Sequence, residues 1–438
     1  MFKTLSNILK VEDLRKKIIF TLLCLIVYRI GNFIPTPNIN SEALKALDEQ
    51  GSSVFGLMNT FSGGALFRFS IFAMGIMPYI TSSIIVQLLS MDVIPKFAEW
   101  AKEGESGRKK LAQITRYGTI VLGLVQGFGT AVGFNNLVRT GAGTIVIDPK
   151  FSTYALIALV LTAGTAFLMW LGEQITEKGI GNGISILIFA GIVANIPTGL
   201  RQLVQQMFID AGDKLFLNII KFIVLVVVVI AIVAGVIFVQ QGVRKIPVQY
   251  AKRVVGRKMY GGQSTHIPMK VNASGVIPVI FAVSLLMFPA TIAQFWSDKA
   301  WAKWIQHNIT IQEPAGIGIT LYVLLIVGFT FFYTFVQMNP QQMAENMKKN
   351  GGYIPGIRPG KTTQVYLTRV MTRLTLAGAI FLALISVLPL IFTDLVGLPA
   401  SLKIGGTSLL ILIGVALETM KTIESQLIKR HYKGFINK

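Results

Sequence analysis

Long apolar segments recur along almost the whole chain, and they constrain the fold more than any other feature of the sequence. Ten windows of about 17–23 residues are apolar enough to cross a lipid bilayer. Because a bilayer offers no water to backbone polar groups, each window is predicted to be helical. The sequence therefore predicts an all-α membrane protein with ten transmembrane helices. The windows are 18–34, 70–90, 114–134, 154–171, 184–200, 219–239, 273–295, 315–336, 374–392 and 404–420.

Lysine and arginine are distributed unequally between alternate connections. The chain has 41 Lys and Arg against 20 Asp and Glu. The two termini and the connections 91–113, 172–183, 240–270 and 337–373 hold 29 of the 41, and the opposite set holds nine. Short cytoplasmic loops of membrane proteins are enriched in these residues, which also attract anionic lipids. We therefore expect a multi-pass protein of the cytoplasmic membrane with both termini in the cytoplasm.

One apolar segment, Ser53–Leu89, is too interrupted to be a single straight helix. Gly63 and Gly64 interrupt it, Pro78 follows, and it carries Arg68. We expect a short helical piece, a break at the glycine pair, and then a span that begins near residue 70. Backbone groups freed at such a break must be covered by other helices or line a cavity. No role for Arg68 follows from the sequence.

Motifs for catalysis, nucleotide binding or metal binding are scarce. The Gly-Lys-Thr at 360–362 does not complete a phosphate-binding loop, because position 355 is Pro instead of Gly. The three histidines are far apart in sequence, and the single cysteine, Cys24, cannot form a cysteine cluster. We expect no enzyme activity, no cofactor and no metal. The nearly uncharged span centres disfavour the main alternative, a secondary transporter of a small solute.

Isoleucines recur beside glycine or proline in several of the windows. Lipid-facing isoleucine is so common that this pattern alone does not separate a pore from a lipid-exposed face. The isoleucines are Ile76, Ile80, Ile184, Ile188, Ile280 and Ile411. Two polar residues, Gln87 in the second window and Asn272 at the start of the seventh, are expected to hydrogen-bond between helices.

Two of the basic connections are long enough to be docking surfaces. The first, 240–270, carries Lys and Arg around a Tyr-Gly-Gly turn, and the second, 337–373, contains the stiff segment Tyr-Ile-Pro-Gly-Ile-Arg-Pro-Gly at 353–360. Ordinary positive-inside bias explains their charge equally well on composition alone. Their length and proline content favour a partner, either ribosomal RNA or an acidic protein surface.

Six sequence blocks, in order and spread over most of the chain, resemble the SecY family of protein-conducting channels. The blocks are FSGGALFRFSIFAMGIMPYITSSIIVQLL (61–89), EKGIGNGISILIFAGIVA (177–194), QSTHIPMKVNASGVIPVIFA (263–282), GYIPGIRPGKTT (352–363), VMTRLTLAGAIFLA (370–383) and GGTSLLILIGVALE (405–418). The resemblance implies two inverted-topology halves, 1–205 and 206–438, hinged near 200–215 around a central hourglass pore.

The resemblance also implies an activity and its partners. Such a channel passes unfolded secretory precursor polypeptides across the membrane and opens sideways to release transmembrane segments into lipid. Its driving force comes from the SecA ATPase or from the translating ribosome, docked on the loops 240–270 and 337–373. Small SecE and SecG subunits are expected to accompany it.

Individual roles follow from the matching blocks. The six isoleucines named above should form the hydrophobic constriction of the pore, which reverses the lipid-facing interpretation. A plug at about 53–66 should seal it from the external side, with Gly63 and Gly64 as its hinge. The lateral-gate residues implied are Gln87 and Asn272, and the docking residues implied are Arg257, Lys258 and Arg358.

Overall fold

The structure is a computed structural model of the 438-residue chain, and it describes most of its residues. The described ranges are 11–40, 59–91, 93–138, 145–209, 215–250, 253–255, 258–260, 264–296, 299–309, 316–396 and 405–436. The first part of the predicted plug, 53–58, lies outside the described residues, and so does most of the second half of the predicted hinge at 200–215.

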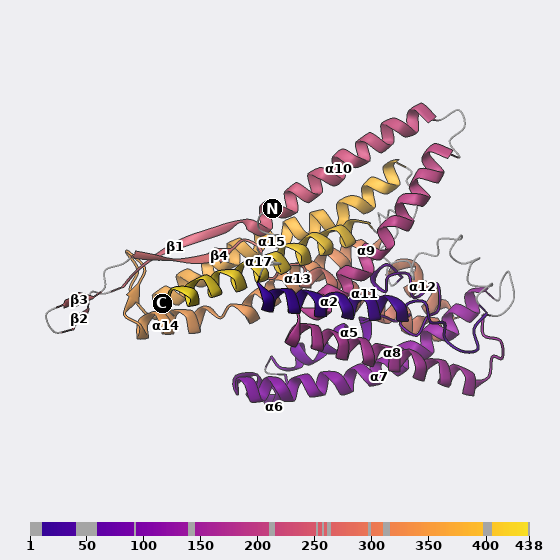
Figure 1. Cartoon of the computed structure of the whole chain (residues 1–438), viewed down its shortest axis with the longest axis horizontal. Coiled ribbons are helices and arrows are strands. Elements are labelled where there is room, and N and C mark those ends of the chain that lie inside the picture. The colour runs from indigo at the N-terminus through magenta and orange to yellow at the C-terminus, as the bar shows by residue number, and fades with distance from the viewer. Residues whose placement is uncertain are drawn as a thin grey trace.

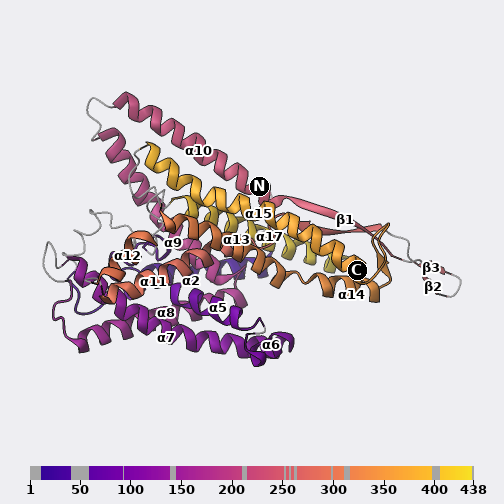
Figure 2. The same cartoon turned by 180° about the vertical axis from the view of Figure 1, so that it is seen from behind.

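Long helices make up most of the described chain and run roughly along the longest axis of the molecule (Figures 1 and 2). A π-helix, η1 (Gln205–Ile209), extends the fifth apolar segment, and a 3-10 helix, η3 (Gln294–Trp296), extends the seventh. The α-helices are α2 (Glu12–Gly31), α5 (Met77–Leu89), α6 (Pro95–Lys102), α7 (Glu105–Val138), α8 (Phe151–Lys178), α9 (Gly183–Val204), α10 (Leu215–Gln241), α11 (Ile277–Ala293), α12 (Ala300–Asn308), α13 (Ile317–Gln337), α14 (Pro340–Lys349), α15 (Lys361–Val396) and α17 (Gly405–Ile436).

The apolar windows of the sequence correspond to these helices. Six described helical stretches are long and apolar enough to cross a membrane, and they contain the third, fourth, fifth, sixth, eighth and ninth windows. The second and seventh windows fall on the shorter apolar helices α5 and α11, and the first and tenth fall on α2 and α17. A helical membrane protein is confirmed, while the count of ten crossing helices stays a prediction.

The packing order places α5 and α11 at the junction between two groups of helices. α7 packs against both α5 and α8, while α13 packs against both α11 and α15, and α15 packs against α17. α5 and α7 also contact α11, which joins the two groups. In Figure 1, α5, α7 and α8 form the lower part of the molecule, and α10, α15 and α17 form the upper part. The main hydrophobic core runs through both groups.

The broken apolar segment differs from the prediction in where its helix begins. Residues 62–76 form a series of turns, and α5 starts only at Met77 instead of near residue 70. Pro78 does not interrupt this helix; it occupies the first turn, where a missing N–H costs nothing. The turns are covered as expected, because Leu66 and Phe69 within them are fully buried. The segment is therefore wrapped by protein, in agreement with the requirement for satisfied backbone groups.

The two basic loops fold into one small β-structure, which the all-helical prediction missed. β1 (Val243–Tyr250) pairs with β4 (Ser264–Lys270) and also with β5 (Gly352–Tyr353), so the sheet order is β4-β1-β5. A two-stranded extension, β2 (Arg253–Val255) with β3 (Lys258–Tyr260), lies at the far end of the hairpin (Figure 1). We call this assembly, with α14, the cytoplasmic platform, after the side of the membrane on which the distribution of Lys and Arg predicts it.

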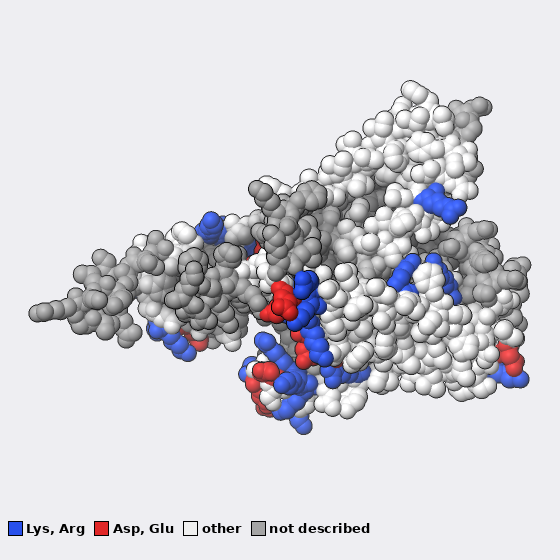
Figure 3. Space-filling view, in the orientation of Figure 1, with Lys and Arg blue, Asp and Glu red and all other residues white. Residues whose placement is uncertain are grey.

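A second hydrophobic core holds the cytoplasmic platform against the ends of the long helices. The first turns of α15 belong to this core and pack under the hairpin. For this reason α15 begins at Lys361, well before the apolar window that begins at residue 374. The buried residues of this core are Ile246, Val248, Met269, Ala344, Met347, Ile354, Leu367, Val370 and Met371. In Figure 3, charged side chains gather most densely around α6, with smaller groups toward each end of the molecule and largely uncharged surface to the right of the dense group.

Candidate functional site

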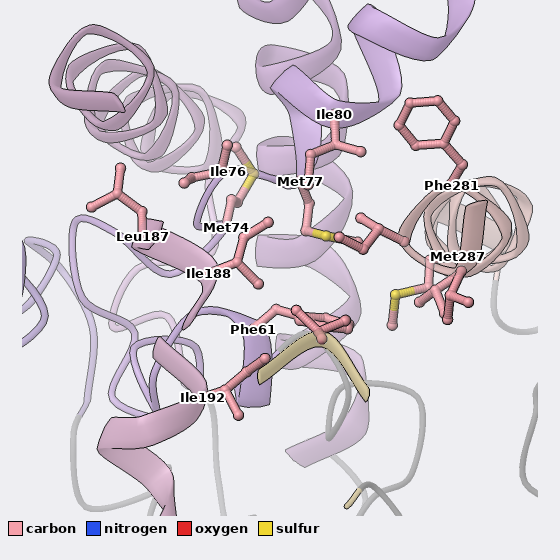
Figure 4. Packing of buried hydrophobic residues seen from close by; sticks show 14 of the residues in the cluster. Phe61, Met74, Ile76, Met77, Ile80, Leu187, Ile188, Ile192, Phe281 and Met287 are labelled. Carbon is pink, nitrogen blue, oxygen red and sulfur yellow. The ribbon is translucent and has the colours of Figure 1, made fainter. Parts of the chain in front are cut away.

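A small apolar cavity lies where the junction helices meet. Four segments of the chain contribute to it: the turns after Asn59, α5, α9 and α11. In Figure 4, the side chains of Ile76, Met77, Ile80 and Ile188 gather around one space, with Phe61 beside it. The residues that line the cavity are Phe61, Ser62, Gly75, Ile76, Met77, Ile80, Ile188, Ile280 and Ser284.

The start of α5 places two of the isoleucines. Ile76 is the residue that caps this helix, and Ile80 lies one turn later on the same face. Gly75 before them has φ +55°, a left-handed conformation that glycine adopts without strain. This turn aims both side chains into the core, where Ile76 and Ile80 are buried.

The glycine-rich turn at 179–183 places Ile188 on α9. The side chain of Asn182 accepts hydrogen bonds from the backbone N–H groups of Ile184 and Ser185 at 3.1 and 3.3 Å, which caps the helix. Gly183 starts the helix directly against the carbonyl of Gly172, a place where a Cβ would overlap backbone. The glycine-rich turn therefore lets α9 begin in close contact with α8.

α11 supplies two further residues of the cavity wall, Ile280 and Ser284. Ile280 is buried on the first turn of the helix, and Ser284 lies one turn later, where its hydroxyl donates a hydrogen bond to the carbonyl of Ile280 at 2.8 Å. The polar atom of Ser284 is thus satisfied within its own helix, and the cavity wall stays apolar in character.

Four of the six predicted isoleucines come together around the cavity, and two do not line it. Ile76, Ile80, Ile188 and Ile280 are lining residues. Ile184 lies one turn before Ile188, half-buried, and Ile411 of α17 is fully buried; both belong to the same hydrophobic core. Sequence reasoning missed Phe61, Met77 and Ser284. Helical spacing could have found Ser284, which is four residues after Ile280.

Side chains of α2 hold the backbone of the segment that closes one side of the cavity. The carbonyl oxygen of Ser62 accepts hydrogen bonds from Tyr28 Oη at 3.0 Å and from Asn32 Nδ2 at 3.2 Å. The carbonyl oxygen of the next residue, Gly63, accepts one from Arg29 Nη1 at 3.0 Å. Arg29 therefore has a specific backbone partner, in addition to its expected place near a span end.

A residue of α9 completes this set of donors. Asn195 Nδ2 donates to the carbonyl oxygens of Asn59 and Thr60 at 3.3 and 3.2 Å. These carbonyls, at the end of a helical turn at 59–61, also accept backbone hydrogen bonds from the N–H groups of Gly64 and Gly63, so the amide adds a further donor to each. We call Tyr28, Arg29, Asn32 and Asn195 the latch, because together they hold residues 59–63.

The glycine pair has the conformation that a sharp change of direction requires. Gly63 and Gly64 have φ of +72° and +83°, which other residues adopt only with strain. The chain also approaches α9 closely at this point. A Cβ added at Gly191 would lie only 3.2 Å from the backbone N of Gly63. The break predicted at this pair is confirmed, and its role as a hinge stays a prediction.

Arg68, for which the sequence suggested no role, lies over an aromatic ring. Its guanidinium carbon is 4.3 Å from the ring centroid of Phe33, and that of Arg29 is 4.9 Å from the same centroid. Cation–π contacts of this kind stabilise the packing of a charged side chain on an exposed ring. Arg68 thus ties the turns before α5 to the segment that follows α2.

Within the part of the chain that the structure describes, the two polar residues predicted for the lateral gate bond within their own segments. Gln87 Nε2 donates to Ser83 Oγ within α5, at 3.2 Å. Asn272 stabilises the turn before α11: its Nδ2 donates to the carbonyl of Gly275 at 2.9 Å, and its Oδ1 accepts from Ser274 Oγ at 3.1 Å. The bonds that the described residues show for Gln87 and Asn272 are local, and their interhelical role stays a prediction.

The seam between α5 and α7 on one side and α11 on the other is packed shut in this structure. The ring of Phe128 on α7 stacks on that of Phe295 in η3, with centroids 5.9 Å apart. Gly129 leaves room for this contact, since a Cβ there would lie 2.7 Å from Phe295. Apolar and aromatic contacts, instead of the polar pair, hold the seam.

Two of the three predicted docking residues, Lys258 and Arg358, lie at the cytoplasmic platform. Arg358 is exposed in the loop after β5. Lys258 begins β3, and Arg257 lies outside the described residues. The two loops were predicted as separate surfaces, but Tyr353 of the second pairs with Gln249 of the first, both through the backbone register and through a 3.0 Å bond from its hydroxyl. They form one surface.

Comparison with known proteins agrees with this geometry. The SecY family model matches residues 70–420. The chain is 62% identical over 437 residues to protein translocase subunit SecY of Halalkalibacterium halodurans, with both chains fully covered. It is 60% identical over 436 residues to the subunit of the same name from Bacillus subtilis, again with full coverage.

Solved structures show the same fold at much lower sequence identity. A protein-conducting channel matches with a TM-score of 0.65 at 19% identity, covering 94% of this chain and 93% of that one. Sec61 in the canine ribosome-channel complex from the endoplasmic reticulum matches with a TM-score of 0.61 at 16% identity, covering 94% and 93%. With a family model over most of its length and relatives that align from end to end, this chain belongs to the SecY family.

Proposed function

We propose that the chain forms the pore of a protein translocation channel, in which the cavity between α5, α9 and α11 is the seal. Family membership makes it a protein translocase subunit, excludes the small-solute transporter, and places it among channel subunits instead of enzymes. The observation that supports the seal is the convergence of four buried isoleucines from three helices on one cavity. Ile184 and Ile411 complete the proposed constriction when the helices move.

The physical basis of the seal is the apolar character of its wall. Branched aliphatic side chains cannot replace the hydration shell of an ion, so a narrow ring of them closes by dewetting and by steric contact. The same side chains adapt their rotamers around a passing polypeptide without specific bonds. An apolar ring therefore stops ions while it accepts unfolded chains of any sequence.

Residues 59–64 are the described part of the proposed plug. Phe61 and Ser62 line the cavity from one side, and the latch holds the carbonyls around them through five hydrogen bonds. Each such bond contributes about 0.5–1.5 kcal/mol net, so the plug is held firmly yet can be released by a bound chain. Gly63 and Gly64 are the proposed hinge.

Sideways release is proposed to occur along the seam between α5 and α7 on one side and α11 and α13 on the other. A central Leu, Ile, Phe or Val favours the bilayer by about 0.3–0.6 kcal/mol, and a charged residue disfavours it by about 2.5–3.5. Apolar segments therefore leave into lipid and polar ones continue. Gln87 and Asn272, near the ends of this seam, remain proposed gate residues through the local structures they stabilise.

The cytoplasmic platform is the proposed docking site for the ribosome and for the SecA ATPase. Its stiff hairpin and the exposed Arg358 offer positive charge for RNA phosphates or acidic side chains. The ribosome-bound Sec61 channel, a relative in fold, supports the first partner. SecE and SecG subunits, anionic lipids, a cytoplasmic-membrane location with cytoplasmic termini, and two halves at 1–205 and 206–438 belong to the same proposal.

The test is ion leak through the resting channel. Proteoliposomes with the variant I76G/I80G/I188G should lose a potassium diffusion potential faster than those with the unchanged chain, because the seal loses its branched side chains. The matched control replaces three exposed residues of α10, I223G/V227G/I230G. The seal assignment fails if the ring variant is as tight as the unchanged chain, or if the control leaks equally.

A further inference from the structure

The short helix α12 lies across the end of the bundle that is opposite the cytoplasmic platform (Figures 1 and 2). It follows α11 and η3 and precedes α13, and it packs against α11. The channel function does not explain its composition, since nine residues include two tryptophans, a lysine and a histidine. A third tryptophan, Trp296, ends η3 just before it.

The side chains of α12 divide into three faces. Ala302, Ile305 and Ile309, spaced by three and four positions, form the inner face: Ala302 is fully buried and Ile309 packs on the main core. Trp301 and Trp304 share a second face and are 46% and 54% exposed. Lys303 is exposed on a third face.

Three different faces indicate three different environments. A helix in water needs one apolar face against the protein and polar residues elsewhere, and a helix within the bilayer core carries no exposed lysine. A helix that lies in the interface plane has protein, lipid and water on separate sides. Only this last arrangement accounts for large exposed indoles next to an exposed lysine on a helix of nine residues.

The tryptophans continue an aromatic band that crosses this end of the molecule. The ring of Trp301 lies 5.7 Å from that of Trp296, which lies 5.8 Å from Phe295. Phe295 stacks on Phe128, whose ring is in turn 5.7 Å from that of Phe151. Aromatic belts of this kind mark the level of the headgroups in membrane proteins.

The next helix supplies the lipid-facing surface that begins at the same level. Ile317, at the start of α13, is 55% exposed, and Leu324, two turns later, is 63% exposed. Lys299, which precedes α12, is exposed like Lys303. Basic residues beside an aromatic belt attract the phosphates of anionic lipids.

We propose that α12 binds the headgroup layer of the lipid bilayer, with Trp301 and Trp304 inserted at the level of the aromatic band and with Lys299 and Lys303 directed to lipid phosphates. Through η3, this contact fixes the depth of α11, one wall of the cavity. The inference rests on the placement of the chain in a membrane and is independent of how the seal works.

The test uses depth-dependent fluorescence quenching of the full chain in liposomes of phosphatidylcholine and phosphatidylglycerol. The sequence has five tryptophans, so four are replaced by Phe and Trp304 alone is kept. Two reference variants start from the chain with all five tryptophans replaced by Phe. V227W, at a 60% exposed site in the middle of α10, is the deep reference, and Q341W on α14 is the reference in water.

Nitroxide-labelled lipids then report the depth. Quenching of Trp304 by a nitroxide near the headgroup should exceed quenching by one near the bilayer centre at least about twofold, with V227W showing the reverse order. Iodide should quench Trp304 clearly less than Q341W. The proposal is overturned if iodide quenches Trp304 as strongly as it quenches Q341W, or if the nitroxide near the bilayer centre is the stronger lipid quencher. It is also overturned if neither iodide nor the nitroxide lipids quench Trp304, because protein would then cover that side chain.

Discussion

The helices α10 and α11 are both strongly apolar, yet they occupy opposite environments. Only 11% of the apolar window of α10 is buried, and Phe238 near its end is 81% exposed. Most of α11 is buried, including Ile280 and Leu286. The difference teaches that hydrophobicity indicates which helices enter the membrane, whereas the breaks around a helix indicate which of them line the cavity. α10 is uninterrupted, while α11 carries Pro278 at its start and Pro289 inside it.

Glycine substitutions should give the largest difference in stability between buried and lipid-facing helices. At Gly164 of α8 a Cβ would overlap the carbonyl of Ile71, and backbone cannot move aside cheaply. G164A should therefore destabilise the protein by several kcal/mol, at the upper end of the range for single substitutions, about 4–5 kcal/mol. Thermal unfolding of the purified protein in detergent measures the effect.

The matched control for this change lies on α10. At Gly235 the nearest atoms to a new Cβ are 3.9 Å away, which is ordinary van der Waals contact. G235A should leave the melting temperature unchanged or raise it, because Ala favours a helix more than Gly does. Equal losses at both positions would remove the distinction between the two environments.

Replacement of leucine by alanine should give the next largest difference in stability between α11 and α10. Leu286 on α11 is 4% exposed, and Leu217 on α10 is 51% exposed. L286A leaves a cavity in the core and should cost about 2–5 kcal/mol, whereas lipid fills the space left by L217A. Melting temperatures of the two variants test this. A larger loss for L217A would place a protein contact, instead of lipid, on α10.

A smaller effect is expected from the latch. Y28F removes the hydrogen bond to the carbonyl of Ser62, which is worth about 1 kcal/mol, so the open population should rise roughly fivefold. The measurement is the resting ion leak of proteoliposomes. N218A, which removes a single Asn bond to the carbonyl of Met207 away from the cavity, is the control. The latch has no part in closure if Y28F and N218A leak alike.

The smallest effect is expected at a partly exposed ion pair. Arg116 on α7 holds Glu173 on α8 through two bonds of 2.9 and 2.8 Å, but both side chains are accessible. R116K loses the bidentate hydrogen bonding of the guanidinium and should lower the free energy of unfolding by less than about 1 kcal/mol. E105Q at an exposed pair on α7 should cost nothing measurable in the same melting experiment. A loss from R116K as large as that from L286A would contradict this order.

The sequence predicted the positions of the helices well, because the bilayer imposes length and composition on each of them. It also predicted the break at Gly63 and Gly64, because adjacent glycines readily interrupt a helix. It placed the start of α5 too early, since residues 70–76 are apolar enough for a span and only their packing keeps them in turns.

The candidate site was predicted only in part from sequence. The isoleucines came from the family resemblance, and four of the six meet at the cavity. The latch could not be predicted, because its bonds join residues 30 or more positions apart. The local bonds of Gln87 to Ser83 and of Asn272 to Ser274 and Gly275 could not be read from the sequence, which does not show which of several possible partners a polar side chain takes. The joining of the two basic loops through β5 is a long-range contact of the same kind.

The central claim is that the buried ring on α5 and α11, and not the exposed face of α10, meets the translocated chain. Its most direct test places a photo-crosslinking amino acid at Ile80, at Ile280 and, as the lipid-facing control, at Val227, in channels that hold a stalled secretory precursor. The account predicts strong crosslinks to the precursor from Ile80 and Ile280 and only background from Val227. Equal labelling from all three positions, or labelling from Val227 alone, would contradict it.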